Sequence, residues 1–224
     1  MAKNFNSQDV VDHYDVHIRK LIPGYEVVHQ QIQALLKTYV NEHAHILIIG
    51  CGTGYELGYL LQLFPHWTFT ATELSITMLD KAKHYIQPLN AQHRVEFVLG
   101  DVQNLKLGQH YDAALSILVT HFVHVHEKFD FFSAIYTRLK HQGVFLTFDL
   151  IKISTAQESE TLKNICEGNG LSAVQAEAMI SRLAVDFYPI SEVETVENLK
   201  LTGFDLVQHF TQILAYQGFM ALKY

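Results

Sequence analysis

The sequence predicts an α/β fold, in which an open twisted sheet of seven strands carries helices on both faces. Three observations lead to this prediction. Apolar, β-branched runs alternate five times with helical patterns between His45 and Leu150, as expected for parallel strands joined by right-handed crossovers. A glycine-rich turn follows the first of these runs. Two more strand-like runs lie close together near the C-terminus, and they predict an antiparallel final strand.

Two helices are predicted ahead of the first strand. Apolar residues spaced three and four apart predict an amphipathic helix over residues 7–21, which Pro23 and Gly24 end. The same spacing predicts a second helix from Tyr25 to Tyr39. These helices make up an N-terminal region of residues 1–44.

The core of the sheet is predicted over residues 45–150. Helices between its strands begin after the glycines, near Ser75 and at Phe129, and prolines end the first two of them. The five strands are expected at 46–49, 67–72, 95–99, 111–119 and 144–150.

The pattern changes after residue 150. Residues 151–190 lack strand signals but contain two helical segments, the second of which begins with a capping box formed by Ser172 and Gln175. We therefore expect a small helical insertion on the substrate side of the sheet. Residues 191–224 are expected to add one helix and a hairpin of strands 204–210 and 213–223, which completes a single domain of residues 1–224.

The composition favours a small-molecule substrate in the cytoplasm. The formal net charge is -7, with only 16 Lys and Arg residues, so the general electrostatic footprint of a nucleic-acid-binding protein is missing. Cys51 and Cys166 are far apart and match neither a disulfide framework nor a metal motif. No leader is expected at the N-terminus, and no apolar run approaches the roughly 18 residues of a membrane span.

The stretch from His45 to Gly58, HILIIGCGTGYELG, predicts a strand that ends in a ligand-binding loop. Glycine suits a sharp strand-to-helix turn in which the ligand touches the main chain. The spacing of Gly50, Gly52 and Gly54 differs from the dinucleotide fingerprint, because Tyr55 stands near the place of its last glycine. No Lys-Ser or Lys-Thr pair follows, which excludes a phosphate-binding P-loop.

Five motifs in order resemble those of the class I S-adenosylmethionine-dependent methyltransferases. They are ILIIGCGTG, FTATELSITML, VEFVLGDV, YDAALSILVTHF and RLKHQGVFLTFDL. The resemblance extends from about His45 to the C-terminus and implies a Rossmann-like sheet with a reversed late strand. It also implies S-adenosylmethionine as cofactor, with S-adenosylhomocysteine as product.

The resemblance further implies where the cofactor binds. Glu73 is expected to accept hydrogen bonds from both ribose hydroxyls, because a carboxylate can accept from two donors at once. Asp101 is expected to receive the adenine amino group. The other cofactor-binding residues implied by the motifs and by the segment before the core are Gly50, Cys51, Gly52, Gly54, Leu74, Met78, Val102, Ser116, Ile117, Arg19 and Tyr25, with Tyr14 beside them.

One position departs from the family pattern. Two residues before Gly50 the family usually places an acid that holds the methionine amino group, and here that residue is Ile48. Glu56, in the first turn after the loop, has two open interpretations: it replaces the missing acid, or it is an acid that suits a helix N-terminus.

The acceptor side is less defined. His121 is a candidate general base, and no metal is expected because His121, His124 and His126 match no zinc spacing. Arg182 and Tyr188 in the insertion are expected on the substrate side; Arg182 either reaches an anionic group or extends into solvent.

Three functions follow as expectations. The main one is methyl transfer to an unidentified small molecule, by a protein that forms a possible homodimer. A narrower resemblance, carried by IPGY, GLSAVQAE, SEVET and FTQILAYQGFMALK, links the chain to the carboxy-S-adenosylmethionine synthases of transfer RNA modification. Since Ile48 replaces the usual acid, a non-catalytic protein that binds S-adenosylmethionine or S-adenosylhomocysteine is the third.

Overall fold

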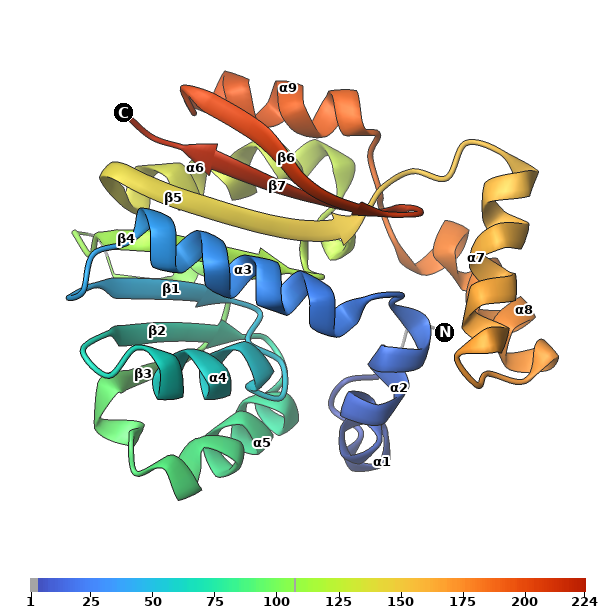
Figure 1. Ribbon diagram of the computed structural model, residues 1–224, viewed down its shortest axis with the longest axis horizontal. Coiled ribbons are helices and arrows are strands. Elements are labelled where there is room, and N and C mark those ends of the chain that lie inside the picture. Colours follow the sequence, from blue (N-terminus) through green and yellow to red (C-terminus); the bar gives the residue numbers. More distant parts are fainter. Residues whose placement is uncertain (1–3, 107) are drawn as a thin grey trace.

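The computed structural model describes residues 4–106 and 108–224, and it contains one seven-stranded sheet in the order β3-β2-β1-β4-β5-β7-β6 (Figure 1). Residues 1–3 of the predicted N-terminal region lie outside the described part. The strands are β1 (His45–Ile49), β2 (Thr68–Glu73), β3 (Val95–Leu99), β4 (Tyr111–Ile117), β5 (Leu139–Leu150), β6 (Leu206–Ile213) and β7 (Tyr216–Leu222).

Strand direction confirms the predicted topology. Neighbouring strands from β3 to β5 pair in parallel, whereas β7 pairs antiparallel with both β5 and β6. Within the described sheet, β7 is thus the one reversed strand. The register aligns Ile49 with Ser116 and Glu73 with Leu99, so the carboxyl ends of the central strands meet at one edge, where open α/β sheets bind ligands.

Helices cover both faces of the sheet because the central strands are apolar on both sides. In β1, Ile46 and Ile48 belong to the core beneath α3 (Tyr25–Tyr39), α4 (Tyr55–Leu63) and α5 (Ile76–Ile86). Leu47 and Ile49 belong to the opposite core, beneath α6 (Lys128–Arg138) and α9 (Glu192–Thr202). This alternation fixes the strand and, with it, the start of the glycine loop.

The insertion is a helix pair, α7 (Ala156–Gly168) and α8 (Ala173–Asp186), beyond the carboxyl edge of the sheet (Figure 1). The predicted capping box at Ser172 is confirmed at the start of α8, and Ser191 forms another with Glu194 at the start of α9. The insertion contacts the N-terminal region: Asn169 Nδ2 donates to Lys20 O at 3.5 Å.

The structure corrects several predicted boundaries. The helix expected over 7–21 is two helices, α1 (Gln8–Asp12) and α2 (Tyr14–Leu21), because His13 interrupts it: its ring Nδ1 bonds the Asp9 carbonyl at 2.8 Å. β4 ends at Ile117 because Leu118 adopts φ +59°. β5 starts five residues earlier than expected, since Leu139 pairs with Tyr111.

The hairpin strands are also shifted: β6 ends at Ile213 and β7 begins at Tyr216, so the turn falls three residues further along than expected. No helix within the described residues is long and apolar enough to cross a membrane.

Candidate functional site

The glycine loop leaves an open surface at the carboxyl edge. Gly50, Gly52 and Gly54 have φ of +65°, +54° and +90°, which side chains with a Cβ rarely adopt. A Cβ on Gly50 would lie 2.6 Å from Val119, and one on Gly54 would lie 3.0 Å from the backbone of Ala82. A Cβ on Gly52 would meet nothing within 4 Å, so a ligand can approach the main chain there.

Glu73 is fixed beside this open surface. Its Oε2 accepts from the Gly52 amide and its Oε1 from the Ser75 amide, each at 2.9 Å. Because a carboxylate oxygen accepts more than one hydrogen bond, both oxygens can still take a ribose hydroxyl. The next residue, Leu74, is 74% exposed, as an adenine-packing side chain requires, whereas Met78 is 3% exposed and lies in the core.

The segment after β3 contains Asp101 and Val102, the residues that were expected to contact adenine. Asp101 Oδ1 accepts from the amides of Gln103 and Asn104 at 2.8 and 3.2 Å, and Asn104 Oδ1 accepts from the Asp101 amide. This capping box fixes the Asp101 carboxylate, and Val102 beside it is fully buried. The Oδ2 atom of Asp101 makes no hydrogen bond among the described residues.

The end of β4 turns sharply toward a buried polar cluster. Leu118 has φ +59°, a conformation that costs a side chain about 1–2 kcal/mol. Ser116 and Ile117, just before it, are buried. The hydroxyl of Thr120 lies 3.4 Å from those of both Ser116 and Thr147. Strained backbone at this place is typical of functional sites.

The structure pairs His121 with Asp149, at the end of β5. His121 Nδ1 lies 2.6 Å from Asp149 Oδ1, and the His121 amide donates to the same oxygen at 3.2 Å. Asp149 Oδ2 accepts from the Thr147 hydroxyl at 3.1 Å. Since a carboxylate only accepts, Nδ1 is the nitrogen that donates to Asp149, and in the neutral imidazole Nε2 is then the acceptor. The imidazole is thereby oriented as a proton acceptor.

The buried side chain of Lys128 contacts the loop that carries His121. Lys128 is 1% exposed, and its ammonium donates to the carbonyl of Thr120 at 2.6 Å. Burial lowers the pKa of Lys128 to about 8, and the charge of Asp149 opposes that lowering. His121, Lys128 and Asp149 line a small cavity.

The N-terminal helices lie at the other end of the glycine loop, where the resemblance places the methionine part of the cofactor. Arg19 Nε donates to Glu26 Oε1 at 2.6 Å, and its guanidinium lies 5.1 Å from the Tyr25 ring centroid. The hydroxyl of Thr53, in the loop, donates to Asp15 Oδ1 at 2.5 Å.

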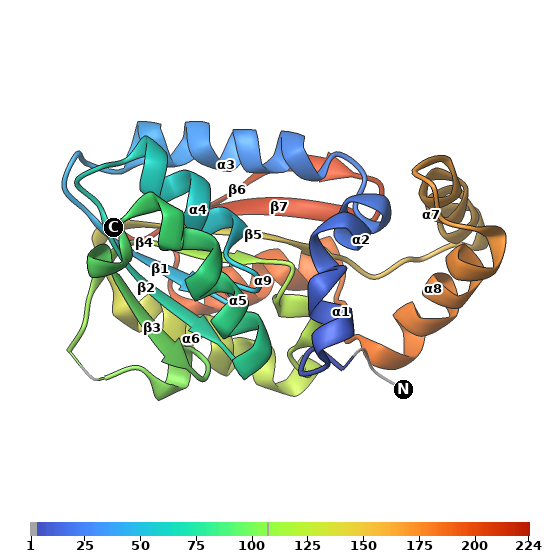
Figure 2. The same ribbon diagram turned by 90° about the horizontal axis from the view of Figure 1, so that it is seen from below.

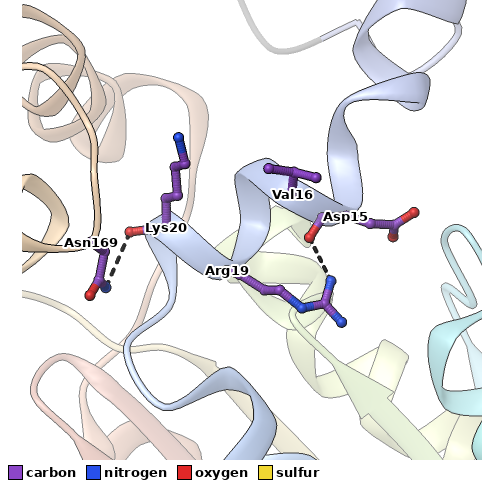
Figure 3. A pocket seen from close by; sticks show the side chains of 5 residues that line it. All are labelled: Asp15, Val16, Arg19, Lys20 and Asn169. Carbon is purple, nitrogen blue, oxygen red and sulfur yellow. Dashed lines mark hydrogen bonds between the residues drawn. The ribbon is translucent and has the colours of Figure 1, made fainter.

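Figure 3 shows Asp15 and Arg19 at a pocket of about 530 Å³ between α2 and the insertion, with the Lys20 side chain extended away from them.

Glu56 is buried rather than exposed at the start of α4. Burial raises the pKa of Glu56 to about 7 and lowers the pKa of the neighbouring His29 to about 4. His29 Nε2 lies 3.6 Å from Glu56 Oε1 and has no hydrogen-bond partner among the described residues. Ile48, where the family has an acid, is 2% exposed in the core. Glu56 is therefore a buried carboxyl near the glycine loop, and among the described residues it forms no ion pair with a lysine or an arginine.

The two expected insertion residues have different surroundings. The Tyr188 amide donates to the His121 carbonyl at 2.7 Å, and its ring stacks on His124 at 3.8 Å. The Arg182 guanidinium instead binds Asp186 Oδ2 at 2.7 Å. The structure thus brings Tyr188 to the His121 loop and pairs Arg182 with Asp186. Among the described residues, no group of three metal-ligating side chains is close enough to hold a metal.

Two site residues escaped the sequence interpretation. Asp149 ends the fifth strand, at the edge where Glu73 and Asp101 end theirs, so strand position was a usable signal. No sequence pattern indicated that Lys128 is buried, because a lysine at a helix start is normally exposed.

Comparisons with known proteins agree with this geometry. Residues 46–143 match the family model described as "Methyltransferase domain". A carboxy-S-adenosyl-L-methionine synthase of Campylobacter hominis is 25% identical over 220 residues, covering 96% of this chain and 93% of the relative. The matched stretch contains the glycine loop, Glu73 and Asp101, and it is similar to a methyltransferase domain.

Other known proteins are similar to part of the chain or to its fold. A malonyl-[acyl-carrier protein] O-methyltransferase of Priestia megaterium is 32% identical over 114 residues, and the chain spans 37% of the length of that protein. The structure of magnesium protoporphyrin IX methyltransferase from Synechocystis, solved with S-adenosylhomocysteine, has a TM-score of 0.67 at 15% identity. It covers 97% of this chain and 98% of its own, and it shows the shared fold.

Proposed function

We propose that the chain transfers the methyl group of S-adenosylmethionine to a hydroxyl of a small molecule, with His121 as general base. The contact between His121 and Asp149 carries this proposal, because it sets a proton acceptor at the sheet edge that also holds the glycine loop. The loops meet directly, since the Val119 side chain packs against Gly50.

The residues present fit the cofactor. The open space at Gly52 leaves room for a ligand against the main chain. Glu73 faces that space with a fixed carboxylate, which suits a ribose diol. We propose Gly50 to Gly54, Glu73, Leu74 and Asp101 as the binding residues.

Each part of the chain has a role in this mechanism. S-adenosylmethionine, when bound, supplies an electrophilic methyl group. The glycine loop and Glu73 would hold the cofactor, and the fixed position of these groups would orient it for attack by the acceptor oxygen. His121 Nε2 takes the proton of the acceptor hydroxyl, and Asp149 stabilises the imidazolium that results. The N-terminal helices exclude water from the methionine end.

Calorimetry with S-adenosylhomocysteine tests the cofactor assignment. We expect the wild type to bind it, and Glu73→Ala to bind it much more weakly. Wild-type protein that fails to bind would overturn the proposal. A screen of hydroxylated acceptors, followed with His121→Asn, tests the reaction; turnover retained by that variant would overturn the assigned base. Tight binding without turnover across a broad acceptor panel would favour a cofactor-binding protein instead.

Carboxyl transfer to the cofactor is the second candidate. It is favoured by the match to carboxy-S-adenosyl-L-methionine synthases over nearly the whole chain. That reaction needs a cation for the added carboxylate, and Arg182 is held by Asp186. Mass spectrometry of ligand co-purified with the protein separates the candidates, because a carboxylated cofactor has a higher mass.

We further propose that the protein works in the cytoplasm, as its acidic composition and separate cysteines suggest. Its partner is then a small molecule rather than a nucleic acid. Light scattering in solution tests the possible homodimer.

A further inference from the structure

Two phenylalanines contact the His121 ring, and a third, Phe5, contacts one of them. The ring of Phe122 lies 4.4 Å from the imidazole and that of Phe187 lies 4.9 Å from it, between centroids. Phe122 also contacts Phe187 at 5.0 Å and Phe5 at 5.8 Å. Figure 2 shows the start of the described chain beside the segment that follows α8. We call Phe5, Phe122 and Phe187 the aromatic cluster.

The aromatic cluster differs from the core aromatics of the same chain. Phe132, Phe145 and Phe204 also contact one another through their rings, and each is 3% exposed or less. By contrast Phe122 is 43% exposed, and the rings of Phe5 and Phe187 are partly exposed. Apolar rings grouped at a surface mark a binding site more often than a core.

The aromatic cluster lies between the expected ribose site and the base. The carbonyl of Phe5 accepts from the Ser75 hydroxyl at 2.7 Å, two residues from Glu73. From there the Phe5 ring reaches Phe122, which directly follows His121. A molecule held against these rings therefore lies next to the proton acceptor.

The contacts of two cations near the aromatic cluster favour a ligand that is held mainly by its rings. Lys128 donates to the Thr120 carbonyl, and Nε of Arg182 donates to Asp186. The aromatic cluster itself offers ring faces beside the His121 imidazole.

From this arrangement we infer that the acceptor is a planar aromatic compound with a ring hydroxyl, packed against Phe122 and Phe187. The inference rests on the proposed function and names its substrate class. The phenolic oxygen gives its proton to His121 Nε2 and forms a bond to the methyl carbon. The carbon–sulfur bond breaks with its electron pair left on sulfur, which yields the methyl ether and S-adenosylhomocysteine.

Calorimetry with protein saturated with S-adenosylhomocysteine tests the inference, with 2-naphthol and decahydro-2-naphthol as probes. The two alcohols share a carbon skeleton, but only the first is planar and aromatic. Two aromatic contacts predict that 2-naphthol binds at least about tenfold more tightly. Phe187→Leu and Phe122→Leu should each weaken 2-naphthol binding about three- to tenfold.

Phe129→Leu is the matched control, because Phe129 is 45% exposed but has no ring contact among the described residues. It should leave 2-naphthol binding unchanged. Phe122, at the surface, keeps the test valid if Phe187→Leu fails to fold. Equal affinity for both alcohols, or unchanged 2-naphthol binding by the folded cluster variants, overturns the inference and leaves the proposed function standing. Failure to bind S-adenosylhomocysteine overturns both.

Discussion

Replacing Lys128 with methionine should remove one component of the pH dependence of stability. In the folded protein the pKa of this buried ammonium is about 8, whereas the ordinary pKa of a lysine side chain is 10.5. Between these two pH values the unfolded chain binds more protons, so the free energy of unfolding of the wild type rises with pH. The full difference corresponds to about 3 kcal/mol, of which about 2 kcal/mol should be recovered between pH 7 and pH 10 after allowance for solvent screening.

Urea unfolding of wild type and Lys128→Met at several pH values measures this effect. The difference between the two proteins should change by about 2 kcal/mol over that range, with the wild type gaining. This change is independent of the hydrogen bond to Thr120 that the variant also loses. Lys106→Met is the control, because the Lys106 side chain is 81% exposed. Parallel pH curves for wild type and Lys128→Met would refute the reasoning.

Three other variants test the site. Glu73→Ala should weaken S-adenosylhomocysteine binding about 100-fold or more by calorimetry, since two charge-assisted hydrogen bonds are lost; an equal loss for the exposed Glu96→Ala contradicts this. Asp149→Asn should lower turnover about 10²- to 10⁴-fold without changing cofactor affinity, because an amide no longer fixes the His121 tautomer; unchanged turnover excludes that base. Burial raises the pKa of Glu56 to about 7, so the wild type loses stability as pH rises from 4.5 through 7, and Glu56→Gln should gain about 3 kcal/mol relative to it at pH 8 but little at pH 4.5. Denaturant unfolding at the two pH values checks this, and a pH-independent difference counts against it.

The sheet could be predicted because its signals are local. Each central strand is an apolar run bounded by glycine, proline or an acid, and β3 matches the predicted residues 95–99. The capping boxes at Ser172 and Ser191 were readable because the two partners are three residues apart. Predicted strand boundaries were wrong where a contact between residues far apart in the sequence decides them, as when Leu139 pairs with Tyr111.

The candidate site was predictable only on the cofactor side. Glu73 and Asp101 end strands next to a glycine loop, and a family pattern connects them. His121 and Asp149 are 28 residues apart, and their contact depends on β4 and β5 pairing in one register. The burial of Lys128 and Glu56 follows from packing against other segments, which sequence periodicity does not encode.

The reversed strand β7 has a consequence for how the site is assembled during synthesis. In the sheet, Asp149 pairs with Gln217, so the segment that carries the carboxylate lacks one of its neighbours until the last strand of the described chain has emerged. The glycine loop and the strands that support it are complete long before. A nascent chain can therefore form the part of the site around the glycine loop first. The part that contains His121 and Asp149 is completed only when residues 216–222 have been synthesised and have paired with β5.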